Sequence, residues 1–267
     1  MPIWRVLVFA GCLAAVLASA PSGAAAKEEP DEPVVPFDPV AQFEHIGIFT
    51  ADKKPRERFV AATKVWVMDF QKHPYRVEWL RSERPFQGPN PHVAFRVENI
   101  EKAAEAAPGL QPVSKPFDAG IARVAFFRTD DGATVEFMEY FPEYAEQPAR
   151  NLQFDHVGLI TTEKKPGERF VAATKVWVTD IAAHPYRVEW LRFEADSPVE
   201  SPVRDHPHVA FRVDCIAEAA KGLKVLIEPF EAGIARVGFY QTDDGAVVEF
   251  MEYFEKPAVR SAPSPSR

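Results

Sequence analysis

Residues 53–81 read KKPRERFVAATKVWVMDFQKHPYRVEWLR, and residues 164–192 read KKPGERFVAATKVWVTDIAAHPYRVEWLR. The two stretches are identical at 24 of 29 positions. Farther along, residues 117–141 match residues 230–254 at 20 of 25 positions. A duplication of this length defines domain organisation directly from the sequence. The chain therefore contains two related units of roughly 100 residues, a size at which one hydrophobic core stabilises a domain.

The composition is that of a folded protein and argues against nucleic acid as a partner. The chain has 267 residues, 46% of them hydrophobic and 26% charged, with a formal net charge of −8. Binding to phosphates of nucleic acid needs clustered Lys and Arg. This acidic chain has no basic run, so the expected partner is a small-molecule ligand or substrate.

The N-terminus predicts export. Arg5 is followed by the apolar run 6–20 and by the small residues 22–26, which together are typical of a secretory signal peptide over residues 1–26. The apolar run is shorter than the ~20 residues of a membrane-spanning helix. We therefore expect a secreted or periplasmic protein without stable membrane insertion after signal removal. Lipidation at Cys12 stays open.

The duplication and the composition divide the remaining chain. We predict a Pro- and acid-rich linker at 27–41, a first domain at 42–142, a second linker at 143–152, a second domain at 153–254 and a disordered tail at 255–267.

Most apolar residues within each repeat alternate with period two, which predicts strands. In the first repeat the expected strands are 43–50, 63–69, 75–81, 92–97, 121–129 and 134–141. Two stretches read as helices, residues 54–62 and 98–107. Asp131-Gly132 predicts a hairpin turn before the last strand. The segments that begin at His45 and His92 are weakly similar, so each repeat is itself faintly doubled.

Four polar residues per repeat lie within predicted strands and form a candidate metal site. They are His45, Glu78, His92 and Glu136 in the first repeat, and His156, Glu189, His208 and Glu249 in the second. Two imidazoles with one or two carboxylates suit Zn, Ni, Co, Mn or Fe, with one divalent ion expected per repeat.

Strand alternation allows these side chains to converge. His45 is expected to share a face with Phe43 and Gly47, and His92 with Ala94. Small neighbours such as Gly47 and Ala94 would leave room for a ligand. The alternative is that each His is a hydrogen-bonded strand residue and each Glu a solvated one.

Other residues are secondary candidates. Catalytic roles are considered for Glu136, Glu249, His73 and His184; the two histidines could exchange protons near the site or be turn residues before proline. Arg123 and Arg236 could meet a substrate carboxylate or be ordinary paired residues. Glu139 and Glu252 alternate to the other face and are expected to be solvated.

The order of these motifs resembles the vicinal oxygen chelate superfamily, which includes glyoxalase I, methylmalonyl-CoA epimerase, extradiol dioxygenases and bleomycin-resistance proteins. The segments that carry the resemblance are [D/E]-H-[I/V]-G, VEWLR, HVAFRV and DGA-x-VEF, and it covers nearly all of 43–141 and 154–254. Residues 188–199, VEWLRFEADSPV, are similar to the epimerase branch, but the base carboxylate of that branch has no counterpart here.

The resemblance implies an α+β fold: tandem glyoxalase-like domains built from paired βαβββ modules, with a curved mixed sheet that forms a cup around a metal ion. It implies that His45, His92 and Glu136, with their second-repeat counterparts, are ligands. Glu78 falls where lyases and epimerases place a Gln or Glu. Only 33 residues separate His45 from Glu78, so one strand or most of the first helix must be missing.

Three functions stay open at this point. The presence of Glu78 and Glu189 favours metal-dependent lyase or isomerase chemistry on a small oxygen-rich substrate. The alternative is a non-catalytic protein that sequesters a small molecule, and the third is an Fe(II) extradiol-type dioxygenase. Whether the cups close within or between repeats, the substrate and the oligomeric state stay open.

Overall fold

A computed structural model describes residues 37–61, 63–83, 91–107, 109–146 and 152–254. The predicted signal peptide at 1–26, most of the linker at 27–41 and the tail at 255–267 lie outside the described residues. The linker ends earlier than predicted, because Pro39–Gln42 form helix α1 and the ring of Phe37 packs against Phe95 at 5.2 Å.

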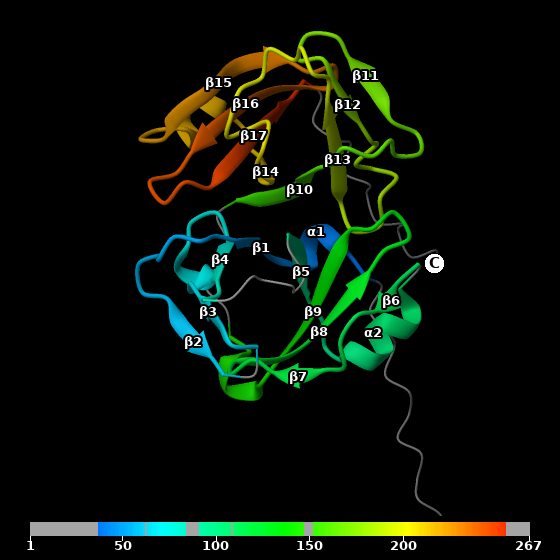
Figure 1. The fold of residues 1–267 in the computed structure, drawn as a ribbon, viewed down its shortest axis with the longest axis vertical. Helices are drawn as coiled ribbons and strands as arrows, with labels where there is room; N and C mark the ends of the chain where they lie inside the picture. The colour runs from blue at the N-terminus through cyan, green and yellow to red at the C-terminus, as the bar shows by residue number, and fades with distance from the viewer. Residues whose placement is uncertain (1–36, 62, 84–90, 108, 147–151, 255–267) are drawn as a thin grey trace, which may run out of the picture. The chain divides into compact units, whose positions relative to one another are not determined.

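The first repeat forms one curved sheet (Figure 1). Its strands are β1 (Phe43–Phe49), β2 (Arg58–Val60), β3 (Val65–Val67), β4 (Val77–Arg81), β5 (His92–Arg96), β6 (Gln111–Pro112), β7 (Phe117–Asp118), β8 (Ala122–Arg128) and β9 (Thr134–Tyr140). Its helices are α2 (Ile100–Ala106) and the 3₁₀ turns η1 (Phe70–Lys72) and η2 (Pro142–Tyr144).

The strand order is β2-β3-β4-β1-β5-β9-β8-β6, with β7 paired to β8. In each half of the sheet the first strand pairs in parallel with the last, β1 with β4 and β5 with β9. The halves are joined by the antiparallel pair of β1 and β5. This is the arrangement of two modules sharing one mixed sheet, as the resemblance implies.

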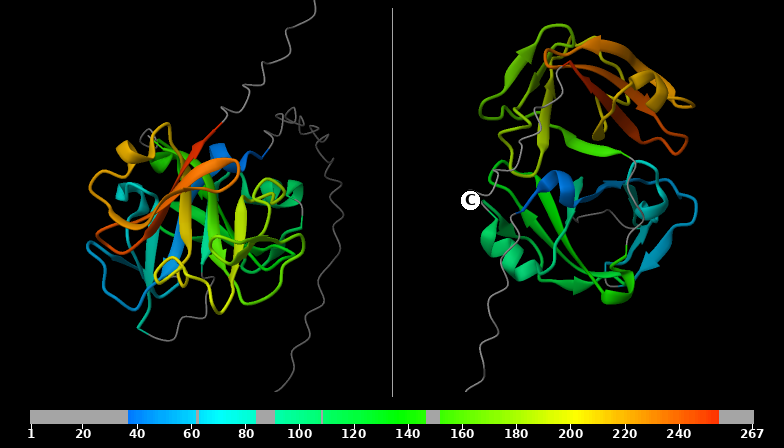
Figure 2. Two further views of the ribbon diagram at one scale, coloured as in Figure 1. Left: turned by 90° about the horizontal axis from the view of Figure 1, so that it is seen from above. Right: turned by 180° about the vertical axis from the view of Figure 1, so that it is seen from behind.

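The second repeat has the same order, β11-β12-β13-β10-β14-β17-β16-β15 (Figures 1 and 2). Its elements are β10 (Gln153–Ile160), β11 (Arg169–Val171), β12 (Val176–Val178), β13 (Val188–Phe193), β14 (His208–Arg212), α3 (Ile216–Ala219), β15 (Lys224–Glu231), β16 (Ala235–Gln241) and β17 (Val247–Tyr253). The α+β fold with two curled mixed sheets is confirmed.

The prediction of a helix at 54–62 is wrong. The described part of this stretch contains a turn, with Arg56 at a φ of 58°, followed by strand β2. The sequence Arg58-Phe59-Val60 alternates, and pairing with β3 offers it a hydrogen-bonded partner that a short isolated helix lacks. Among the described residues the first module of each repeat therefore has four strands with no α-helix between them, which explains the short spacing between His45 and Glu78.

The second predicted helix is confirmed as α2. Asn99 is its N-cap, and the side-chain oxygen of Asn99 accepts a hydrogen bond from the backbone N–H of Lys102 at 2.8 Å. The predicted hairpin turn is also present. Gly132 has a φ of 95°, and its N–H donates to the carbonyl of Thr129 at 3.0 Å.

A β-bulge reorders the side chains of β1. The register against β5 shifts between Phe43 and His45, so Glu44 is an extra residue. A bulge re-aims the residues on either side of it. Phe43 therefore enters the same core as Ile46, and His45 points to the opposite face. The expectation that Phe43 and His45 share a face is wrong for this reason. Strand β10 has the same bulge at Asp155.

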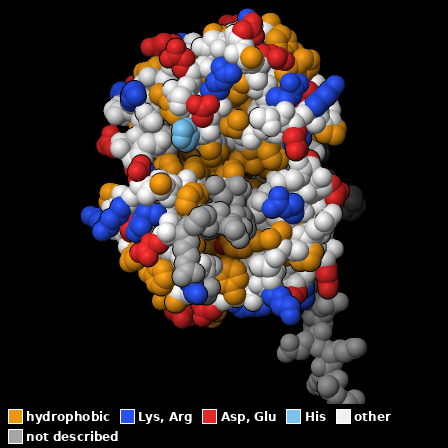
Figure 3. All heavy atoms as spheres, in the orientation of Figure 1, with side chains coloured by type: hydrophobic (Ala, Val, Ile, Leu, Met, Phe, Trp, Pro, Cys, Tyr) orange, Lys and Arg blue, Asp and Glu red, His pale blue; other side chains and the backbone are white. Residues whose placement is uncertain are grey.

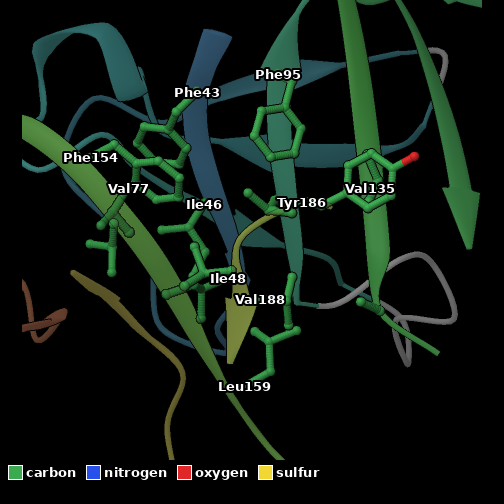
Figure 4. Close-up of a cluster of buried hydrophobic side chains, with 14 of the residues drawn as sticks. Phe43, Ile46, Ile48, Val77, Phe95, Val135, Phe154, Leu159, Tyr186 and Val188 are labelled. Atoms are coloured by element: carbon green, nitrogen blue, oxygen red, sulfur yellow. The ribbon is translucent and has the colours of Figure 1, made fainter. Parts of the chain in front are cut away.

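The faces opposite the candidate ligands pack against each other in one core. This core contains Ile46 and Ile48 from β1 together with Leu159 from β10 (Figure 4). At its edge the ring of Phe43 stacks on the ring of Phe154 at 3.8 Å. The two repeats thus cover this face of one another's sheet.

On the face drawn in Figure 3, acidic and basic side chains are interspersed among the described residues without a continuous basic patch. No helix in the described ranges is both long and apolar enough to span a bilayer.

Candidate metal centres

The strand register places the four candidates of the first repeat in two adjacent rows on one sheet face. Gly47 lies between Glu78 on β4 and His92 on β5. In the neighbouring row His45 pairs with Ala94, which pairs with Glu136 on β9. The second repeat repeats both rows around Gly158 and Ala210. Ligand-type side chains therefore converge over the two small residues in each repeat.

In the first repeat the donor atoms gather around the Glu136 carboxylate. Its Oε2 lies 3.0 Å from Nε2 of His92 and 3.3 Å from Nε2 of His45. Nε2 of His45 is 3.3 Å from Nε2 of His92 and 3.6 Å from Oε2 of Glu78. The two histidines and Glu136 are buried. All four predicted residues are thus brought together.

The second repeat reproduces this geometry. Oε2 of Glu249 lies 3.1 Å from Nε2 of His208 and 3.2 Å from Nε2 of His156. Oε2 of Glu189 lies 3.7 Å from Nε2 of His156. Three possible donors lie within 4.8 Å of one another in each repeat, and they are His45, His92 and Glu136 in the first and His156, Glu189 and His208 in the second.

Gly47 and Gly158 leave the space that the imidazole rings of His92 and His208 occupy. A Cβ on Gly47 would lie 2.0 Å from Cε1 of His92, and a Cβ on Gly158 would lie 1.9 Å from Cε1 of His208. Only a residue without a side chain allows the imidazole to lie across the strand. The space above each glycine therefore holds an imidazole ring, and the expectation that small residues leave room for a ligand stays a prediction.

Several buried polar atoms in these clusters lack a hydrogen bond of acceptable geometry. They include Oε2 of Glu136 and of Glu249 and Nε2 of His156 and of His208. Leaving a buried polar atom unsatisfied costs about 1–3 kcal/mol. A divalent cation would satisfy these converging lone pairs at once, so the residues present fit a metal ion.

The two carboxylates of each centre differ in pKa. Burial alone would raise the pKa of Glu136 and of Glu249, but their contacts with the paired histidines lower it to about 2 in both. Burial raises the pKa of Glu78, and it raises the pKa of Glu189 to about 7 despite the nearby His156. The second centre therefore pairs one firmly ionised carboxylate with one that can hold a proton near neutral pH, and in the first centre burial raises the pKa of Glu78 in the same direction.

This difference predicts a pH dependence of stability in the metal-free protein. Glu189 ionises near pH 4.5 when unfolded and near 7 when folded. The folded state thus binds more protons in this window, so the free energy of unfolding should fall as pH rises from 4.5 to 7. We expect this decrease in the free energy of unfolding to be on the order of 3 kcal/mol in wild type and to be absent in Glu189→Gln. Chelator-treated proteins would be compared by urea unfolding at pH 4.5, 6 and 8.

Glu231→Gln, at an exposed position, is the matched control and should track wild type at every pH. An equal pH dependence in wild type and Glu189→Gln would contradict the raised pKa of Glu189.

A mostly apolar cup lies over the first centre. His45, Glu78 and Glu136 form its base, and the apolar residues that line it are Val60, Val67, Phe70, Leu80, Phe117, Ala119, Ile121, Val124, Phe126 and Met138. Arg58 and Thr63 add polar groups to the lining. A ligand that suits this cup has an apolar body and oxygen atoms directed at the base.

Arg58 and its counterpart Arg169 were missed by the sequence analysis. Both lie on a strand that was expected to be helical, and both lower the pKa of the protonatable glutamate of their own centre. Recognition of the alternation in Arg-Phe-Val, present in both copies, could have found them.

His73 and His184 have a different surrounding from the one expected. Nε2 of His73 lies 3.3 Å from Oδ2 of Asp244, and Nε2 of His184 lies 3.3 Å from Oδ2 of Asp131. Each pair joins one repeat to the hairpin turn of the other. His73 is absent from the lining of the first cup. Both histidines form a contact between repeats, and the acid–base role considered for them stays a prediction.

Two further expectations are corrected or settled by contacts. Glu139 is not simply solvated: its Oε2 accepts a hydrogen bond from the N–H of Ile100 at the start of α2, at 3.1 Å. Glu252 does the same for Ile216 at the start of α3. Arg123 forms ion pairs with Glu139 and with Glu101, so it is the ordinary paired residue of the two alternatives.

Comparison with known proteins identifies relatives in structure only. No family model and no curated protein matches the sequence. A Mn(II)-bound glyoxalase from Novosphingobium aromaticivorans is 14% identical with a TM-score of 0.44, covering 80% of this chain and 83% of its own. The 2,3-dioxygenase LapB from Pseudomonas sp. KL28 is 11% identical with a TM-score of 0.43, covering 84% and 96%.

A third structure, a mutant 4-hydroxymandelate synthase from Streptomyces coelicolor, is 12% identical with a TM-score of 0.47, covering 81% of this chain and 93% of its own. At such identities the likeness concerns the fold. The glyoxalase-like architecture of this chain rests on its own strand order, which is the order expected for paired modules around a cup.

Proposed function

We propose that this protein is a metal-dependent enzyme with one divalent metal centre per repeat, and that it carries out lyase- or isomerase-type chemistry on a small oxygen-rich substrate. The supporting observation is the convergence of two imidazoles and two carboxylates in each repeat, with separations of 3.0–3.7 Å between the contacting donor atoms.

In this proposal the two histidines and the firmly ionised glutamate of each repeat hold the ion. When bound, a divalent ion supplies Lewis acidity toward oxygen atoms of a substrate. The apolar walls of the first cup exclude water, and Arg58 attracts negative charge on a ligand. The fourth side chain, Glu78 or Glu189, distinguishes these centres from a two-His, one-carboxylate dioxygenase set.

Proton transfer is assigned to Glu78 and Glu189, not to Glu136 and Glu249. A general acid–base is most effective when its pKa is near the working pH, and Glu189 has a pKa of about 7. Glu136 and Glu249, with pKa values of about 2, are suited to holding a cation. This reverses the catalytic role considered for Glu136 and Glu249 from the sequence.

Elemental analysis of protein purified without added metal tests the proposal. We expect about two equivalents of Zn, Ni, Co or Mn per chain. Iron in that amount would support a dioxygenase instead, and protein that neither contains nor takes up metal would support the non-catalytic binding protein.

A second measurement tests the chemistry. In D₂O, the metal-loaded protein should exchange protons next to the carbonyl of a small hydroxy- or oxo-acid, followed by NMR across a panel of such acids. The double variant Glu78→Gln/Glu189→Gln should lose at least 10²-fold of that exchange, the usual contribution of a general acid–base. Retention of exchange in this variant, with metal still bound, would remove both residues from proton transfer.

A further inference from the structure

We infer that the two metal centres are not equivalent, and that the second repeat binds its ion more tightly than the first. The inference rests on the proposed function, because it concerns the same two centres. It is carried by the residue before the first histidine, which is Glu44 in the first repeat and Asp155 in the second.

Asp155 holds the first histidine of its centre in place. Its Oδ1 accepts a hydrogen bond from Nδ1 of His156 at 2.9 Å, on the ring edge opposite the donor atom Nε2. Asp155 is fully buried. Its carboxylate is fixed in turn by Nη2 of Arg187 at 3.0 Å, by the hydroxyl of Tyr253 at 2.9 Å and by Nε of Arg212. A carboxylate so anchored sets both the orientation and the tautomer of the ring.

The first repeat has no such contact. Nδ1 of His45 is buried without a hydrogen-bond partner. The side chain of Glu44, one methylene longer, instead contacts Nη2 of Arg76 and accepts a hydrogen bond from the hydroxyl of Tyr140 at 2.9 Å. The counterparts of both partners, Arg187 and Tyr253, hold Asp155 in the second repeat, so the two acids differ in side-chain length within a similar set of partners.

In the first repeat a stacking contact restrains the position of the His45 ring but not its tautomer. The ring of His45 stacks on Phe70 at 4.2 Å, a residue replaced by Ile181 in the second repeat. Stacking restrains the ring plane but leaves open which nitrogen carries the proton. A hydrogen bond from Nδ1 to a carboxylate settles this and makes Nε2 a stronger donor, and losing such a partner lowers metal affinity about 10- to 100-fold.

Single-centre variants separate the two affinities. His92→Ala leaves the second centre intact, and His208→Ala leaves the first. Both proteins would be stripped with chelator and titrated with Zn²⁺ at pH 8 against a chromophoric chelator. We expect the protein that retains the second centre to bind Zn²⁺ about 10- to 100-fold more tightly.

Replacing Asp155 with Glu and Glu44 with Asp tests whether these residues cause the difference in metal affinity. In the His92→Ala background, Asp155→Glu should lower the affinity about 10- to 100-fold, and in the His208→Ala background Glu44→Asp should raise it. Glutamate at 155 should be accommodated, because the first repeat holds Glu44 among the equivalent partners. Asp205→Glu, an exposed position, is the matched control and should change nothing.

A purely structural role for Asp155 would be recognised by a second readout. In ¹⁵N-histidine NMR spectra, the downfield Nδ1–H signal of His156 should be lost in Asp155→Glu and kept in the control, while thermal unfolding checks that the variant is folded. Equal affinities of the two centres, or an unchanged affinity in folded Asp155→Glu, would overturn the inference and leave the proposed function standing. Absence of Zn²⁺ binding at both centres would overturn the proposed function itself.

Discussion

Replacing His92 with alanine is expected to halve the zinc bound per chain, from about two equivalents to about one. Nε2 of His92 lies 3.0 Å from Oε2 of Glu136, and its ring occupies the space above Gly47. Removing the imidazole leaves one histidine and two carboxylates in the first centre. Such a set is a weak zinc site, whereas the second centre is unaffected because its donors come from the other sheet.

The measurement is the zinc content after dialysis, with His206→Ala as the control. His206 is exposed, so its replacement should leave the stoichiometry unchanged and exclude adventitious binding by surface imidazole. The double variant His92→Ala/His208→Ala should bind almost none. A His92→Ala protein that still holds two equivalents would show that His92 is not a ligand.

Gly47→Ala is the complementary change, because it removes no donor atom but displaces one. Its Cβ would meet the His92 ring at 2.0 Å, closer than real contacts allow, so the ring would have to move. Loss of one zinc equivalent in both variants would show that the first centre needs the His92 imidazole to be present and also correctly placed. Alternation alone placed Gly47 on the face of His45, but it did not predict that the ring of His92 lies over Gly47.

The sequence predicted the candidate ligands because their signal is local. Each ligand lies in a short alternating segment, and the duplication separated these polar residues from the variable ones. The bulge at Glu44 was not foreseen, since nothing in Phe43-Glu44-His45 marks an extra residue; it is defined only by the register with β5. The contact of Asp155 with His156 was not predicted either, because it depends on the length of the acidic side chain.

The contacts between the repeats were also not predictable from the sequence. The hairpin turn was recognised as a turn, but not that Asp131 accepts a hydrogen bond from Nε1 of Trp190 at 2.6 Å, or that Asp244 accepts one from Nε1 of Trp79 at 2.7 Å. Pairings over such separations in sequence carry no local pattern. The helix at 54–62 was misassigned for a different reason, because the short alternation of Arg58-Phe59-Val60 was not recognised as a strand that pairs with the nearby β3.

These reciprocal contacts lead to the second large effect, a loss of stability in Tyr186→Ala. Tyr186 is fully buried, and although it belongs to the second repeat its ring lies 5.7 Å from Phe37 and 6.1 Å from Phe95 of the first. We expect the free energy of unfolding to fall by about 3–5 kcal/mol, the usual cost of truncating a buried aromatic side chain to alanine. The measurement is urea unfolding of chelator-treated protein.

Two controls define the origin of this loss. Tyr186→Phe keeps the ring and should retain most of the stability, whereas Tyr144→Ala removes an exposed ring, 42% accessible, and should change the stability by no more than about 0.5 kcal/mol. A loss below about 1 kcal/mol in Tyr186→Ala would mean that the ring is not packed as described.

The shape of the unfolding transition shows whether the two repeats unfold together or separately. Tyr75 of the first repeat packs reciprocally against Phe211 and Phe250 of the second, at 6.1 and 5.9 Å. One core therefore contains residues of both repeats, and neither sheet can lose its partner without exposing its own apolar face. Wild type should accordingly unfold in one transition, monitored identically by tryptophan fluorescence and far-UV circular dichroism. In Tyr186→Ala the single transition should move to lower urea as a whole. Two separate transitions in wild type would instead show that each repeat folds independently, in spite of the residues they share in this core.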